Sequence, residues 1–257
     1  MNRITHLFNK KKSDILSIYF TAGYPALDDT FRVLSALQAK GIDLVEIGIP
    51  FSDPMADGAV IQRAANQALR NGMTLRRLFE QLKTLRQTIN IPVVLMGYLN
   101  PVMQYGFEAF CRSCAQTGID GMIIPDLPFA DYLAEYKEVA DKYNVKMIML
   151  ISPETSEERI RLIDKYTSGF IYMVSSAAVT GAQNRFSDNV KDYFKRIAAM
   201  NLNNPQLAGF GISNRETLQV AMTYTAGAIV GSKFVELLGK ANEPADAVSA
   251  LMMALEN

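Results

Sequence analysis

Residues 28–49 read DDTFRVLSALQAKGIDLVEIGI, a stretch in which an amphipathic segment leads into a short apolar run. In the first part, Phe31, Leu34 and Leu37 recur every three residues, which predicts a helix over 28–41 with one apolar stripe. The second part, LVEIGI, is almost continuously apolar, which is typical of a parallel strand covered on both faces. The stretch therefore predicts one helix-to-strand step of an α/β fold.

The same alternation of short apolar runs and longer amphipathic segments continues along the chain. Helices are predicted, among others, over 74–87, 130–143 and 156–166, and a short helix over the N-terminal residues. Eight evenly spaced βα units favour a closed (β/α)8 TIM barrel over the competing doubly wound open sheet. The eight predicted strands are ILSIYFTAG (15–23), LVEIGI (44–49), IPVVLMGY (91–98), IDGMIIPD (119–126), VKMIMLIS (145–152), GFIYMVSS (169–176), PQLAGFGI (205–212) and AGAIVGS (226–232).

The size and composition of the chain fit one such barrel. Its 257 residues are close to the ~250 typical of the fold, although two smaller domains would also fit this length. Hydrophobic residues make up 49% of the chain, enough for a large core. No low-complexity linker or break in composition divides the sequence. We therefore expect a single domain over 1–257.

The charge balance argues against several classes of partner. The 26 basic and 26 acidic residues give a formal net charge of zero, so no basic field attracts nucleic acid. The cluster Lys10, Lys11 and Lys12 is explained as a solvated helix end rather than a membrane anchor. Charges interrupt the first twenty residues, which predicts neither a signal peptide nor a membrane span. We expect a cytoplasmic protein that binds neither nucleic acid nor membrane.

Metal and thiol chemistry find little support in the sequence. Cys111 and Cys114 form a Cys-x-x-Cys motif, but they fall late in an amphipathic helix, whereas a redox pair is expected at a helix start. The only histidine, His6, lies in the charged N-terminal stretch. A metal site built on nitrogen or sulfur ligands is therefore not expected, and the sequence predicts no metal.

The second predicted strand carries a carboxylate where apolar residues are expected. Because side chains alternate along a strand, Val45 and Ile47 should face the helices, while Leu44, Glu46 and Gly48 face the barrel axis. Burying an ionised glutamate is costly, and we expect no lysine or arginine in the strand cores to pair with it. One interpretation is a buried glutamate held by hydroxyl or backbone groups. We favour the other, an acid of raised pKa that donates and recovers a proton.

Two long connections follow strands at the end of the barrel where active sites lie. The first, from Ile49 to Gly58, contains Asp53 and Asp57. Both aspartates suit a loop, but Asp57 is placed to fold back over the barrel mouth toward Glu46. The second connection, from Ser175 to about Asn189, is a candidate cover for the site.

Other side chains complete the candidate site. Tyr172 shares a strand face with Phe170 and Val174, so it points either into the site or into an ordinary core. The segments GFGIS (209–213) and IVGSK (229–233) each place glycine and serine between a strand and a helix start, where backbone N–H groups bind anions. They follow the seventh and eighth strands, the usual phosphate site of barrels. A small phosphorylated substrate is therefore expected.

Several of these segments resemble the α subunit of tryptophan synthase. The resemblance runs collinearly over essentially the whole chain, and EIGIPFSDPMADG (46–58) is its most specific part. It implies a (β/α)8 barrel that cleaves indole-3-glycerol phosphate to indole and glyceraldehyde 3-phosphate by a retro-aldol reaction, a lyase reaction in tryptophan biosynthesis. The other matching segments are FTAGYP (20–25), the Tyr98-x-Asn-Pro segment, VTGAQNR (179–185), GFGIS and VGS.

The resemblance also implies roles for individual residues. Glu46 and Asp57 match the catalytic pair and Tyr172 the supporting tyrosine. Glu46 is expected to protonate indole C3 and then to help remove the glycerol hydroxyl proton, while Asp57 accepts the indole N–H. Tyr19 and Met96 would line the indole pocket, although core packing explains them equally well. The remaining substrate-binding residues implied are Thr180, Gly181, Phe210, Gly211, Gly231 and Ser232.

A partner is implied as well. The family's β subunit carries pyridoxal phosphate and forms an α2β2 complex with the α subunit, which itself needs no cofactor. The residues expected to face it are Pro50, Asp53, Pro54, Asn100 and Pro101. The chain departs from the family's pattern at Ser176 and Ala178, where arginine and glycine are usual, and this bears on loop closure and coupling to the partner.

Three alternatives remain open at this stage. The first is another phosphosugar barrel, although the sixth strand lacks the lysine of a Schiff-base aldolase and the histidines of epimerases or isomerases are missing. The second is a weakly active subunit that mainly activates a β partner. The third is a stand-alone lyase that releases indole.

Overall fold

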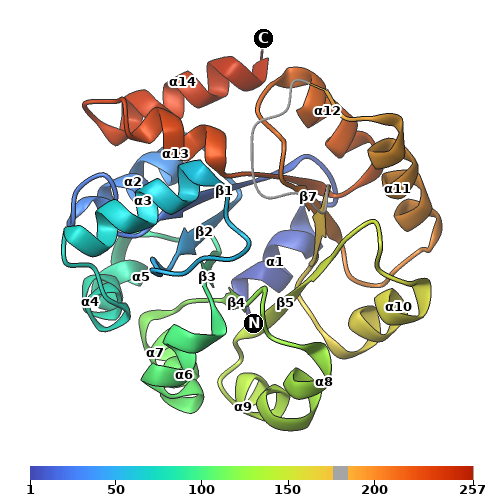
Figure 1. Cartoon of the computed structure of the whole chain (residues 1–257), viewed down its shortest axis with the longest axis horizontal. Coiled ribbons are helices and arrows are strands. Elements are labelled where there is room, and N and C mark those ends of the chain that lie inside the picture. Colours follow the sequence, from blue (N-terminus) through green and yellow to red (C-terminus); the bar gives the residue numbers. More distant parts are fainter. Residues whose placement is uncertain (176–184, 257) are drawn as a thin grey trace.

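The computed structural model describes residues 1–175 and 185–256, and its strands form a closed parallel barrel in the order β1 to β8. All eight predicted strands are present, and the closed barrel excludes the open sheet (Figure 1). Each strand is shorter than predicted, because its apolar run continues into the adjoining loops. The strands are β1 (Ile15–Thr21), β2 (Leu44–Gly48), β3 (Val93–Met96), β4 (Gly121–Ile123), β5 (Lys146–Ile151), β6 (Ile171–Val174), β7 (Gln206–Gly209) and β8 (Gly227–Val230).

Helices surround the barrel as an outer ring in Figure 1. The helices predicted over 28–41 and 156–166 are confirmed as α2 (Asp29–Ala39) and α10 (Glu157–Tyr166). The other helices are α1 (Arg3–Lys10), α3 (Ala59–Arg70), α6 (Leu99–Tyr105), α7 (Phe107–Thr117), α11 (Asp188–Ala199), α12 (Arg215–Tyr224), α13 (Ser232–Leu238) and α14 (Pro244–Glu256), besides the two segments described next.

Two predicted helices are not continuous. The segment predicted over 74–87 is divided into α4 (Leu75–Gln81), a 3₁₀ turn η1 (Leu82–Thr84) and α5 (Leu85–Thr88). The tighter turn lets Leu82 and Leu85, three residues apart, both be fully buried. The segment predicted over 130–143 becomes α8 (Phe129–Asp131), a π turn η2 (Tyr132–Tyr136) and α9 (Lys137–Lys142). This π turn buries Tyr132 and brings the ring of Tyr136 within 4.5 Å of the Phe107 ring, centroid to centroid.

The barrel has two apolar regions, as the alternation along β2 predicts. Val45 and Ile47 belong to the large cluster between the strands and the outer helices. Leu44 belongs to a smaller cluster inside the barrel, which includes Ile4 and Phe8 of α1. Helix α1 crosses the middle of the ring in Figure 1 and packs beside the first residues of the strands, so it closes the amino end of the barrel.

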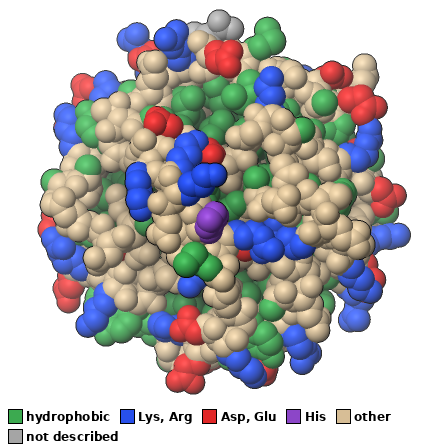
Figure 2. Space-filling view, turned by 180° about the vertical axis from the view of Figure 1, so that it is seen from behind, with side chains coloured by type: hydrophobic (Ala, Val, Ile, Leu, Met, Phe, Trp, Pro, Cys, Tyr) green, Lys and Arg blue, Asp and Glu red, His purple; other side chains and the backbone are tan. Residues whose placement is uncertain are grey.

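The cysteines and the histidine, for which the sequence predicts no redox or metal site, lie on helices outside the cavity. Cys111 and Cys114 are free thiols buried in α7, and burial raises the pKa of the Cys111 thiol to about 12. His6 is exposed on α1, on the face seen in Figure 2. Over residues 1–175 and 185–256, no cluster of three or more histidine, cysteine or acidic residues is arranged to hold a metal ion. Within the same ranges, no helix has the length and apolarity needed to cross a membrane.

Candidate active site

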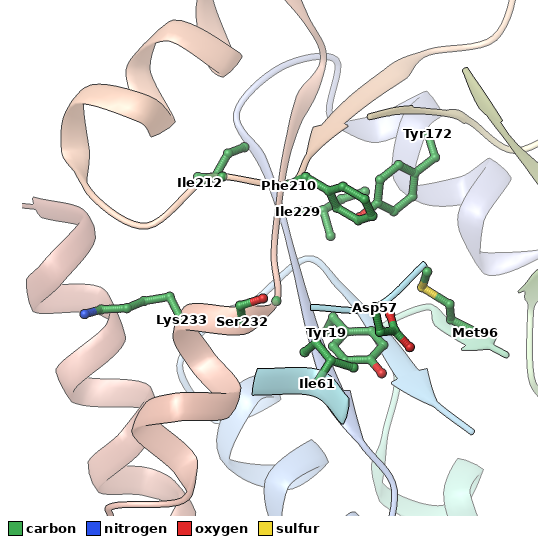
Figure 3. A pocket seen from close by; sticks show the side chains of 12 residues that line it. Tyr19, Asp57, Ile61, Met96, Tyr172, Phe210, Ile212, Ile229, Ser232 and Lys233 are labelled. Carbon is green, nitrogen blue, oxygen red and sulfur yellow. The ribbon is translucent and has the colours of Figure 1, made fainter. Parts of the chain in front are cut away.

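A cavity opens at the carboxyl ends of the strands, where ligands of such barrels bind. In Figure 3 the rings of Tyr172 and Phe210 lie on one side of it. Tyr19, Asp57 and Met96 lie on the other side. The lining residues are Tyr19, Asp57, Ile61, Met96, Tyr172, Phe210, Gly211, Ile212, Ile229, Gly231, Ser232 and Lys233.

Glu46 points into the barrel, as predicted, but it does not line the cavity. Its side chain is fully buried, and in the pairing of β1 with β2 it lies opposite Tyr19, a residue of the cavity wall. The carboxyl group therefore lies beneath the cavity floor. The hydroxyl of Ser17 donates a hydrogen bond of 2.9 Å to its Oε1, whereas Oε2 is buried without a partner.

This environment makes Glu46 a weak acid. Burial raises the pKa of its carboxyl group to about 8, and the hydrogen bond from Ser17 opposes part of that rise. The expectation that the strands contain no basic residue is wrong, because β5 begins with Lys146. Lys146 lies beside Ile4 and Gly169 at the amino end of the barrel, and it forms no ion pair with Glu46. The glutamate is therefore protonated at neutral pH.

Asp57 reaches the cavity from the segment between β2 and α3. The phenol of Tyr98 donates a hydrogen bond of 3.1 Å to Oδ2 of Asp57 and accepts one of 3.0 Å from the backbone N–H of Ala56. Burial raises the pKa of the Asp57 carboxyl, and the bond from Tyr98 lowers it again. Both carboxyl groups lie near Tyr19 and Tyr172, but they differ in accessibility, one beneath the cavity and one in its wall.

Two glycines make room for the tyrosines of the wall. A Cβ atom at Gly48 would lie 2.0 Å from the hydroxyl oxygen of Tyr19. A Cβ atom at Gly209 would lie 2.4 Å from that of Tyr172. Only glycine at these two strand ends allows the phenol rings to occupy their observed positions.

The far end of the cavity is formed by backbone after β7 and β8, where a phosphate was expected. Phe210, Gly211, Gly231 and Ser232 all line it. Phe210 has a left-handed backbone with φ of +67°, which is strained for a residue with a side chain. The hydroxyl of Ser175 donates a hydrogen bond of 2.6 Å to its carbonyl oxygen and so supports this conformation.

The segments expected to face a partner lie together. The Phe51 ring packs against the Tyr98 ring with centroids 5.5 Å apart, which joins the loop after β2 to the start of α6. Asp53 and Asn100 are exposed, and Met55 at the same loop is 90% exposed. Pro54 and Pro101 are half-buried and Pro50 is buried, so the accessible part of this region is smaller than the set predicted.

Part of the predicted cover lies outside the described residues. This applies to Ser176 and Ala178, where the chain departs from the family's pattern, and to the substrate-binding residues Thr180 and Gly181. Arg185, the first described residue after them, is exposed and pairs with Glu216 of α12 at 3.0 Å.

The sequence did not single out Ser17 or Tyr98 as site residues. Ser17 and Tyr19 are two residues apart on β1, so both side chains face the inside of the barrel. A hydroxyl at a position where an apolar side chain is expected could have indicated Ser17 as a site residue. Tyr98 follows the end of β3, where ligand-binding side chains gather, but spacing does not show that it reaches a loop 41 residues earlier.

Comparisons with known proteins identify the family of the chain and agree with its fold. Residues 6–257 match the sequence model of the family described as "Tryptophan synthase alpha chain". A protein of that name from Parabacteroides distasonis is 66% identical over 256 residues, covering 100% of both chains. The crystal structure of tryptophan synthase subunit alpha from Legionella pneumophila superposes with a TM-score of 0.89 at 34% identity, covering 99% of this chain and 97% of that one. A chain of the tryptophan synthase complex from Pyrococcus furiosus gives 0.84 at 34% identity, covering 96% and 98%.

Proposed function

The chain belongs to the tryptophan synthase alpha chain family, and from this premise we propose which of its residues carry out the family's reaction. The chain is a lyase of tryptophan biosynthesis whose reaction is the retro-aldol cleavage of indole-3-glycerol phosphate. That reaction needs a proton delivered to indole C3, a proton removed from the glycerol hydroxyl, and a group that holds the indole N–H.

Glu46 is the proton donor in this proposal. A carboxylic acid with a pKa of about 8 is protonated at neutral pH and can take the proton back. It transfers its proton to C3, which makes the adjacent carbon–carbon bond breakable, and its carboxylate then accepts the hydroxyl proton as that bond breaks. The substrate meets it from above, between Tyr19 and Tyr172. The partnerless Oε2 beneath the cavity is the single observation that carries this assignment.

Asp57 accepts the indole N–H and stabilises the positive charge that develops on the ring. Its position in the cavity wall, fixed by Tyr98, supports this role. Tyr19, Met96 and Tyr172 supply the flat apolar walls that an indole ring requires.

The phosphate group binds at the opposite end of the cavity. Backbone N–H groups of Gly211, Gly231 and Ser232 are the donors we assign to it, together with Phe210 and, from the segment outside the described residues, Thr180 and Gly181. Anchoring the phosphate there orients the indole end over Glu46.

We propose a β subunit as the partner and assign its binding to the region around Asp53, Pro54, Asn100 and Pro101, with Pro50 beneath it. The similar structure from Pyrococcus furiosus is described as a tryptophan synthase complex, which supports such a partner. The chain needs no cofactor of its own, and pyridoxal phosphate belongs to the β subunit. A phosphorylated biosynthetic substrate fits the expected cytoplasmic location.

The test is to measure indole release from indole-3-glycerol phosphate by the purified chain, alone and with a β subunit. We expect release in both cases, and Glu46→Gln should reduce kcat by about 10²–10⁴-fold. Release only in the presence of the β subunit would instead identify a weakly active, activating subunit. Substantial turnover by Glu46→Gln would refute the acid–base assignment.

A further inference from the structure

We propose that Ser17 is a positioning residue that gives the two oxygens of Glu46 different tasks, so that Oε1 is held by the protein and Oε2 transfers the proton. The proposal rests on the role proposed above for Glu46. It goes further because it names the atom that carries the proton and the residue that selects it.

The strand register brings the two side chains together. In the β1–β2 pairing Tyr19 lies opposite Glu46 and Ser17 lies opposite Leu44, so Ser17 is the diagonal neighbour of Glu46 on the inner face. Both side chains are 0% exposed. The hydrogen bond of 2.9 Å between Ser17 Oγ and Glu46 Oε1 is therefore formed without access to water.

The side chain of Ser17 lies among apolar residues, and its hydroxyl interacts only with Glu46 among the described residues. The neighbouring inward residues, such as Ile15, Leu44 and Val94, form an apolar cluster. A hydroxyl buried among such side chains destabilises the fold unless it is hydrogen-bonded. Glu46 is its one hydrogen-bonding partner within residues 1–175 and 185–256.

The direction of this hydrogen bond determines where the acid proton resides. With Ser17 donating to Oε1, the proton of the neutral carboxyl is carried by Oε2, which has no partner in the protein. When the Oε2–H bond breaks and the C3–H bond forms, the resulting carboxylate keeps one hydrogen bond at Oε1. Its Oε2 is then free to accept the proton of the glycerol hydroxyl as the carbon–carbon bond breaks, which returns the acid to its starting state.

The two phenols that face Glu46, Tyr19 from β1 and Tyr172 from β6, remain uncharged during this cycle. Asp57 lies near both tyrosines and is the carboxylate assigned above to the indole N–H. Burial raises the pKa of both phenols above the usual value, so neither ionises in the working range of Glu46. Ser17 is thus the group whose removal should change the proton affinity of Glu46 most directly, since its hydrogen bond lowers the pKa of that carboxyl.

The experiment compares Ser17→Ala, Ser17→Thr and the unaltered chain in the indole-release assay as a function of pH. For Ser17→Ala we expect the alkaline limb of the kcat profile to move up by about one to two pH units, because a hydrogen bond to a charged group is lost. We also expect kcat at pH 7 to fall by about 10- to 100-fold with little change in KM, because the proton is no longer held on one oxygen. Ser17→Thr keeps the hydroxyl and should restore both properties.

A matched control is Thr167→Val, which removes a buried hydroxyl bonded to the carbonyl of Ile163, outside the cavity. It should lower stability as Ser17→Ala does but leave the pH profile in place. An unchanged profile in Ser17→Ala would overturn the proposal, as would a fall in kcat that Thr167→Val reproduces.

A spectroscopic readout separates this proposal from the role of Glu46 in catalysis. The infrared carboxyl band that disappears in Glu46→Gln reports the protonation of Glu46 directly. In Ser17→Ala this band should shift in frequency and persist to higher pH, and an unshifted band with unchanged titration would contradict the proposal. If the band shifts while Glu46→Gln retains full activity, the positioning holds and the acid–base role fails.

Discussion

The phenol of Tyr98 bridges the loop after β2 at two points, donating to Oδ2 of Asp57 at 3.1 Å and accepting from the Ala56 N–H at 3.0 Å. We expect Tyr98→Phe to release Asp57 and to reduce kcat about tenfold, because a hydrogen bond that fixes a substrate-binding carboxylate is lost. The pKa of Asp57 should rise, since the bond from Tyr98 lowers it. Indole release as a function of pH measures both effects.

Tyr105→Phe is the matched control for this substitution. Tyr105 is the last residue of α6, the helix that begins directly after Tyr98, and its hydroxyl is hydrogen-bonded to Ser113 at 3.0 Å. It is not among the residues that line the cavity. It should leave kcat unchanged. Equal losses in the two variants would mean that Tyr98 acts through the stability of α6 and not through Asp57.

Gly48 and Tyr19 compete for the same space. Since a Cβ atom at Gly48 would lie 2.0 Å from the Tyr19 hydroxyl oxygen, Gly48→Ala should displace the phenol ring and lower the free energy of unfolding by about 1–3 kcal/mol. Tyr19→Leu removes the outer part of the ring. In chemical denaturation, the double variant Gly48→Ala/Tyr19→Leu should therefore lose less than the sum of the single variants.

Gly231→Ala provides the comparison for that cycle. A Cβ atom at Gly231 would lie 3.5 Å from the nearest Tyr19 atom, an ordinary contact. It should therefore show no coupling with Tyr19→Leu. Strict additivity at Gly48 would show that the ring can move aside at no cost.

The hydroxyl of Ser175 donates a hydrogen bond to the carbonyl oxygen of Phe210, whose left-handed backbone is strained. This hydrogen bond should contribute to phosphate binding. We expect Ser175→Ala to raise KM up to about tenfold with kcat nearly unchanged, because one hydrogen bond worth about 1 kcal/mol holds the left-handed Phe210 in place. The inhibition constant of glycerol phosphate should rise in parallel. Ser152→Ala, after β5, removes a hydroxyl bonded to Thr155 and should change neither constant; equal effects of the two would refute the role of Ser175.

The sequence predicts the barrel well because its signals are local and repeated. Each strand is a short apolar run, and the inward parity of Glu46 and Tyr172 follows from alternation along a single strand. The broken helices at 74–87 and 130–143 were missed because Leu82 and Leu85, three residues apart, and Tyr132 and Tyr136, four apart, still resemble one helical stripe.

The candidate site was predicted less completely, since its contacts join distant segments. The bond from Tyr98 to Asp57 spans 41 residues and that from Ser17 to Glu46 spans 29, and neither separation leaves a periodic signal. The oversight of Lys146 has a different origin, because its position at the first residue of β5 places it beside α1 rather than near Glu46. Alternation along one strand thus identifies the inward-facing catalytic residues. Their hydrogen-bonding partners can be identified only when the register between neighbouring strands is known.

The raised pKa of Glu46 predicts how the stability of the protein depends on pH. Between the ordinary carboxyl pKa of 4.5 and the folded value of about 8, the folded protein holds a proton that the unfolded chain has released. Unfolding then releases a proton, so the contribution of Glu46 to stability decreases as pH rises across this window. We expect this contribution to fall by about 4 kcal/mol between pH 5 and pH 8.

Glu46→Gln should remove this dependence, because the amide does not titrate. The free energy of unfolding of both proteins is measured by urea denaturation at several pH values. The value for Glu46→Gln minus that for the unaltered chain should increase as pH rises, and it should be largest above pH 8. Glu158→Gln makes the same change at an exposed position of α10 and should follow the unaltered chain at every pH. If the difference between Glu46→Gln and the unaltered chain is constant with pH, the carboxyl is already ionised in the folded protein, and Glu46 has no proton to give at neutral pH.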